Sequence, residues 1–128
     1  MGRATNIIFN GNICALTTSN GLNVELEINN EWTEITFKYI NGQQFGEFVF
    51  KDLEDGSYKL MRMYSEPNDN GGIGRVALEL FKRVTNNIPI YVSPIDGETR
   101  DDQSHLTEIA PIFVPKMITA GLIIGYKD

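Results

Sequence analysis

Apolar and polar residues alternate along the first half of the chain, a pattern typical of half-buried β-strands. The alternation is clearest between Leu22 and Ile28, where every second residue is apolar and the residues between are Asn or Glu. Asn-Gly pairs and similar turn residues separate these runs. The pattern therefore predicts an antiparallel meander of short strands at residues 6–9, 13–16, 22–28, 33–39, 45–50 and 58–64.

The hydrophobic period lengthens after residue 72. Apolar residues between Ile73 and Val84 recur at helical spacing, which predicts an amphipathic helix that ends at Asn86. Residues 88–92 read as a short strand. A strand, a helix and a strand in this order need a crossover, so we expect residues 58–64 and 88–92 to pair in parallel.

A second helical stripe follows between Leu106 and Met117, but Pro111 and Pro115 lie inside it. Proline removes a backbone donor and clashes with the preceding turn, so we expect a break near Pro111. Proline is well tolerated in the first turn of a helix, which favours a helix beginning there. Gly121 is a natural residue to end this helix, and residues 122–126 read as a final strand.

Composition narrows the classes of function. The chain has 128 residues, the size of one domain, with 17 acidic and 11 basic residues and a net charge of −6. That charge argues against nucleic-acid partners and anionic membrane surfaces, and no apolar run is long enough to span a membrane. A single Cys and a single His argue against a Cys/His metal site. Cys14 is expected in the core, and its lack of a disulfide partner favours a cytoplasmic location.

A glycine-rich stretch at residues 68–75 carries the candidate chemistry, because it connects a predicted strand to a predicted helix. Glycines allow a ligand to approach the backbone, and the N–H groups at a helix start favour anions. The stretch therefore predicts a phosphate or pyrophosphate site. A glycine turn without a ligand explains the same residues equally well. Without a Lys-Ser or Lys-Thr pair after the glycines, the stretch is not a P-loop.

The Gly72-Ile73-Gly74 sequence and the order of elements resemble the GCN5-related N-acetyltransferase (GNAT) superfamily. Residues 107–116, which end at Lys116, are similar to a second signature of that family. The resemblance implies an α+β fold in one domain, residues 1–128. It also implies a GNAT-like mixed, mostly antiparallel sheet, with an amphipathic helix after the glycine-rich loop and a C-terminal helix-strand unit.

The function implied by the resemblance is acetyl transfer from acetyl-CoA, the co-substrate, to a primary amine of unknown identity on a small molecule or a protein lysine. The residues implied to bind acetyl-CoA are Tyr64, Asn70, Gly71, Gly72, Ile73, Gly74 and Arg75.

A second hypothesis is a non-catalytic interaction module that has a degenerate CoA site and binds a basic protein partner. Two positions favour it: Asp69 stands where the family has Arg or Gln, and Val114 stands where the family often has Tyr. The sequence assigns no catalytic residue. His105, Glu47 and Glu66 are candidate bases, but each is better explained as a polar residue without a catalytic role.

The sequence also offers a hypothesis for assembly. Residues 45–50 form a long hydrophobic run. If this run were an edge strand, it would be able to pair across a homodimer.

Overall fold

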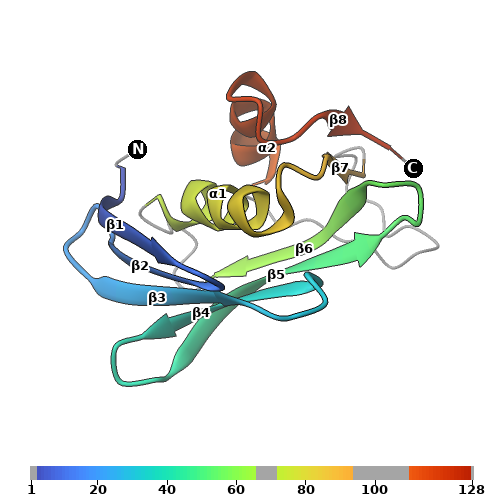
Figure 1. The fold of residues 1–128 in the computed structure, drawn as a ribbon. Coiled ribbons are helices and arrows are strands. Elements are labelled where there is room, and N and C mark those ends of the chain that lie inside the picture. Colours follow the sequence, from blue (N-terminus) through green and yellow to red (C-terminus); the bar gives the residue numbers. More distant parts are fainter. Residues whose placement is uncertain (1–2, 66–71, 94–109, 128) are drawn as a thin grey trace.

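The computed structural model describes residues 3–65, 72–93 and 110–127. These residues form an eight-stranded sheet whose strands lie side by side in sequence order. Figure 1 shows α1 (Ile73–Thr85) across one face of the sheet, with α2 (Ala110–Thr119) beyond it. The strands are β1 (Thr5–Asn10), β2 (Ile13–Thr17), β3 (Asn23–Ile28), β4 (Glu34–Tyr39), β5 (Gln44–Asp52), β6 (Tyr58–Ser65), β7 (Ile90–Val92) and β8 (Gly125–Tyr126).

Strands β1 to β6 form the predicted antiparallel meander. In β3, Val24, Leu26 and Ile28 are buried, whereas the polar residues between them are partly or fully exposed. One face of the sheet therefore packs on the helices and the other faces solvent. The predicted parallel pairing is also confirmed, because Tyr58 of β6 aligns with Ile90 of β7.

Two aromatic residues of β5 pack against aromatic residues of the two helices. The ring of Phe81 in α1 stacks on Phe50, with 4.5 Å between the ring centroids. The ring of Phe113 in α2 meets Phe48 edge-on at 6.2 Å. Residues of both helices and of the sheet belong to one buried cluster, so the two helices share a single core.

Local signals end both helices where the sequence predicts. Asn86 adopts a left-handed conformation (φ 60°) after α1, as Asn does more readily than most residues. After α2, Gly121 has φ 79° and Leu122 donates its N–H to the carbonyl of Met117 at 2.9 Å, which is a Schellman cap. Pro111 lies in the first turn of α2, as proposed, and Pro115 lies inside the helix.

The expected α+β, GNAT-like architecture is wrong. The described chain is dominated by one eight-stranded mixed sheet, and its helices have only 13 and 10 residues, with no GNAT-like arrangement. The physical reason lies in the uninterrupted meander. Turn residues and period-two patterning recur from Thr5 to Ser65, so six consecutive strands precede α1 along the chain.

The proposed edge strand is also wrong. Residues 45–50 lie in β5, which is paired on both sides by β4 and β6. The outer strands are β1 and β8, so a homodimer built on β5 has no free edge to use. Neither helix in the described part of the chain is long and apolar enough to cross a membrane.

Candidate functional site

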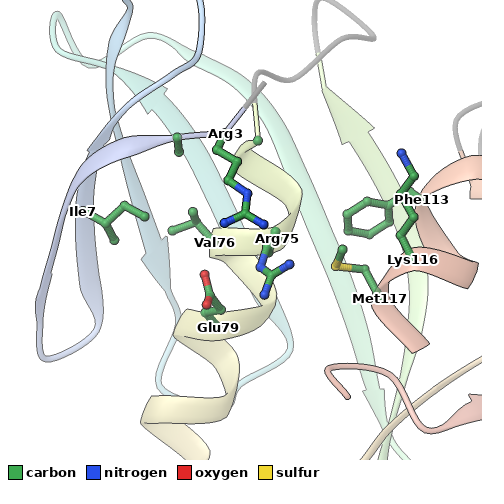
Figure 2. Close-up of a pocket in the computed structure, with 10 residues that line it drawn as sticks. Arg3, Ile7, Arg75, Val76, Glu79, Phe113, Lys116 and Met117 are labelled. Carbon is green, nitrogen blue, oxygen red and sulfur yellow. The ribbon is translucent and has the colours of Figure 1, made fainter. Parts of the chain in front are cut away.

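A pocket of about 440 Å³ lies between residues 3–7, which we call the N-terminal segment, and the helices α1 and α2. We call it the α1 pocket. Its apolar lining comes from all three elements, as Figure 2 shows, and consists of Ala4, Ile7, Val76, Phe113 and Met117. A volume of this size suits a small molecule, and apolar walls with a few polar groups are typical of such sites.

The charged residues of the α1 pocket are mostly basic. Arg3, Arg75 and Lys116 line it, against one acidic residue, Glu79. In Figure 2 the Arg3 and Arg75 guanidinium groups lie over the exposed side of α1, and Lys116 lies on the α2 side. The pocket thus carries a local positive charge on a chain whose net charge is −6. Such a pocket favours an anionic ligand that also has an apolar part.

Gly72 is the N-cap residue of α1 and also lines the α1 pocket. Its backbone is left-handed, with φ 91° and ψ 2°. No side chain caps the start of α1, and no acidic residue lies in its first turn. The partial positive charge of the helix start is therefore not offset by a carboxylate of that turn.

The structure gathers only part of the predicted CoA site. Gly72 and Arg75 line the α1 pocket, whereas Ile73 and Gly74 are buried beneath it in α1. Asn70 and Gly71 lie outside the described residues.

Tyr64 does not line the α1 pocket with the predicted CoA-binding residues. Its neighbour Met63 is buried in the core, and Tyr64 itself is 44% exposed. Consecutive strand residues face opposite sides of a sheet, so the Tyr64 side chain lies on the face away from the helices.

Residues 107–116, the segment similar to the second GNAT signature, contribute to the pocket although none of them was predicted to bind a ligand. Phe113 and Lys116 both line the α1 pocket. Val114 is fully buried in the core instead, and its aliphatic side chain offers no proton donor to the pocket. Helical geometry explains the split, since residues 113, 116 and 117 share a side of α2 that reaches the pocket.

The candidate bases remain apart from the pocket where they are described. Glu47 lies in β5, aligned with Tyr64 and next to the buried Phe48. Its side chain is therefore on the face of the sheet away from the helices, which we call the open face. Gln44 donates a hydrogen bond to the Glu47 carboxylate at 3.4 Å. His105, Glu66 and Asp69 lie outside the described residues.

Arg3, Ile7 and Glu79 are pocket residues that the sequence did not reveal. Arg3 and Ile7 are far from α1 in sequence, and no spacing rule connects them to the glycine-rich stretch. Glu79 lies within the predicted helix, where nothing in its spacing indicates a pocket.

The other two basic residues of α1, Lys82 and Arg83, already interact with neighbouring groups of the protein. The Lys82 ammonium donates to the carbonyl of Ile88 at 2.9 Å, and its partial burial lowers the pKa of Lys82. The Arg83 guanidinium lies 4.3 Å from the ring centroid of Phe9. By contrast, within the described residues the Arg3 and Arg75 guanidinium groups have no hydrogen bond or ion pair.

The described residues provide neither a metal-binding cluster nor a reactive thiol. Within residues 3–65, 72–93 and 110–127, no group of three or more His, Cys, Asp and Glu residues is placed to hold a metal ion. Cys14 is buried, and burial raises the pKa of its thiol to about 11. A thiol with so high a pKa is a poor nucleophile near neutral pH.

Comparison with known proteins adds no candidate function. No protein-family model matches the chain, and neither the curated proteins nor the solved structures contain a match.

Proposed function

We propose that the protein binds acetyl-CoA in the α1 pocket and transfers the acetyl group to a primary amine. The observation that carries this proposal is the pairing of basic and apolar residues in one pocket at the start of α1. Phosphates suit the Arg3 and Arg75 side of the pocket, and the adenosine or pantetheine part suits the Phe113 and Met117 side.

A second feature supports the same proposal. The parallel pairing of β6 and β7 ends at the Leu60–Val92 pair, but β6 itself continues to Ser65. The continuing part of β6 leads into the segment that precedes α1. We place the thioester beside this part of β6, where backbone amides would stabilise the developing negative charge on the carbonyl oxygen.

The proposed transfer needs no covalent enzyme intermediate. The amine nitrogen attacks the thioester carbonyl carbon, the carbon–sulfur bond breaks, and the CoA sulfur leaves as a thiolate. The attacking nitrogen loses one proton to water or a nearby base, and the thiolate takes up a proton from solvent. A cytoplasmic location, where acetyl-CoA is available, is part of the proposal.

Two measurements test the proposal. Isothermal titration calorimetry of the full chain with acetyl-CoA should show saturable binding, weakened about ten-fold or more by Arg75→Gln because one charge-assisted contact is lost. Lys51→Gln is the matched control, because Lys51 is an exposed basic residue of β5 that does not line the pocket. Release of free CoA thiol should then rise when spermidine, an aminoglycoside or a lysine peptide is added.

The outcomes separate binding from catalysis. Binding without thiol release for any amine would overturn the transferase and keep the CoA site. Absence of binding at millimolar acetyl-CoA would overturn both.

Two carboxylates on the solvent-facing side of the sheet support the second hypothesis, an interaction module for a basic partner. Glu27 of β3, Thr36 of β4 and Glu47 of β5 align across the open face of the sheet. Lys38 reaches the Glu27 carboxylate at 3.8 Å and offsets part of this charge. Under this proposal a lysine-rich peptide binds the open face, and Glu47→Gln weakens it whereas Glu79→Gln does not. Equal effects of the two substitutions would exclude the open face as the docking surface.

A further inference from the structure

The N-terminal segment packs directly on the start of α1. A Cβ placed on Gly72 would lie 2.6 Å from the backbone nitrogen of Ala4 and 3.3 Å from the Cα of Arg3. The nearest obstacles are backbone atoms, which cannot rotate away as a side-chain tip does. Glycine at position 72 therefore allows the two backbones to meet, and this contact brings Arg3 to the α1 pocket.

The contact places Arg3 and Arg75 in one pocket although they are 72 positions apart. In Figure 2 both guanidinium groups lie over the same exposed side of α1. The other two basic residues of α1, Lys82 and Arg83, are engaged by Ile88 and Phe9. Among the described residues, the Arg3 and Arg75 guanidinium groups have no hydrogen bond or ion pair to compete with a ligand.

Arg3 and Arg75 are both exposed where they line the pocket, so each guanidinium is accessible to a ligand from solvent. Glu79 offsets one positive charge, which leaves a net positive charge with Arg3, Arg75 and Lys116 present. An anion that contacts both guanidinium groups offsets this charge. Because a guanidinium presents a planar fork of donors, two of them suit two adjacent phosphate groups better than one carboxylate.

We propose that Arg3 is a ligand-binding residue of the α1 pocket, and that the Arg3 and Arg75 pair selects a pyrophosphate group over a singly charged anion. The N-terminal segment is then a wall of the binding site and not only an outer strand of the sheet. This inference rests on the proposed function, since both place the ligand in the α1 pocket. It adds the charge class of the ligand and a residue from a different part of the chain.

The test uses inorganic pyrophosphate, ADP and acetate as probes, with calorimetry on the full chain. Pyrophosphate and ADP should bind, and acetate should not. Arg3→Gln should weaken pyrophosphate and ADP about ten-fold or more, as expected for the loss of a charge-assisted hydrogen bond. Lys51→Gln removes one positive charge from outside the pocket and should leave both affinities unchanged.

A double-mutant cycle tests the packing contact. Gly72→Ala forces the N-terminal segment away from α1, so Arg3→Gln should have no further effect on pyrophosphate binding in that background. Full additivity of the two substitutions would show that the Gly72 contact does not position Arg3. Circular dichroism identifies a Gly72→Ala chain that fails to fold, and Arg3→Gln alone then decides the proposal.

The outcomes distinguish this inference from the proposed function. Acetyl-CoA binding or acetyl transfer that is insensitive to Arg3→Gln would overturn the role of Arg3 and keep the function. Arg3-dependent pyrophosphate binding without acetyl-CoA binding would overturn the function and keep the inference. Acetate binding as tight as pyrophosphate binding would overturn the selectivity.

Discussion

Phe81 of α1 lies nearly parallel to Phe50 of β5, with 23° between the ring planes and 4.5 Å between their centroids. Phe81 is fully buried, and the ring of Tyr58 meets it edge-on at 5.5 Å. This aromatic contact fixes the middle of α1 on the sheet. The same helix carries Arg75 and Glu79, so the contact also fixes the helix that forms one wall of the α1 pocket.

Replacing Phe81 with Ala should lower the free energy of unfolding by about 3–5 kcal/mol, because the ring leaves a cavity under α1. Urea unfolding followed by circular dichroism measures the change. Ile112→Ala on α2 is the control, since Ile112 is 59% exposed and its loss should cost less than about 0.5 kcal/mol. A Phe81→Ala cost as small as that of the control would contradict the packing described.

Gly72→Ala should destabilise the protein more than Gly42→Ala. Both glycines have φ near 90°, so alanine pays a similar conformational cost of about 1–2 kcal/mol at each position. Only at Gly72 does the new Cβ meet backbone, because nothing lies within 4 Å of a Cβ at Gly42. The difference between the two urea midpoints isolates the contact with Ala4. Equal midpoints would mean that the N-terminal segment moves away without cost.

Asp55 should contribute to the pH dependence of stability below neutral pH. Ser57 donates to the Asp55 carboxylate through its hydroxyl, and Lys127 donates to it at 2.9 Å. These hydrogen bonds, that from Ser57 first, lower the pKa of Asp55 from 3.8 to about 2. A folded-state pKa below the unfolded value stabilises the fold above the unfolded pKa, and this stabilisation is lost as the pH falls towards about 2.

Ser57→Ala should therefore raise the pKa of Asp55, measured by NMR titration of its carboxyl carbon. The variant should be less stable than the wild type at about pH 5, and the difference should shrink as the pH falls through the acidic range. Lys127→Gln is the comparison, and it should raise the pKa less because the hydrogen bond from Ser57 is the larger cause. A larger effect of Lys127→Gln would reverse this order.

Cys14 should not react with a thiol reagent while the protein is folded. Its side chain is fully buried, and desolvation raises the pKa of the thiol to about 11. Ellman's reagent should label Cys14 slowly in buffer and rapidly in denaturant. Fast labelling of the folded protein would contradict the burial. The unreactive thiol also keeps the background low when CoA release is followed with the same reagent.

Local patterns alone determined most of the secondary structure of this protein. Period-two alternation identified the six strands of the meander, and the stripe after residue 72 identified α1. Asn86 and Gly121 marked helix ends because each favours a left-handed backbone. These signals depend only on residues close in sequence, so they predict secondary structure without knowledge of the fold. The same local reading led to the wrong edge strand, since the pairing of β5 on both sides depends on β4 and β6 together.

Tertiary structure alone decided the composition of the site. The glycine-rich stretch indicated an anion site at the start of α1, but Arg3 and Ile7 reach it only because the N-terminal segment packs on Gly72. It also decided that Tyr64 faces away from the helices and that Val114 points into the core. Contacts between distant segments depend on how whole elements bury their apolar faces together, and no short-range spacing in the sequence encodes that packing.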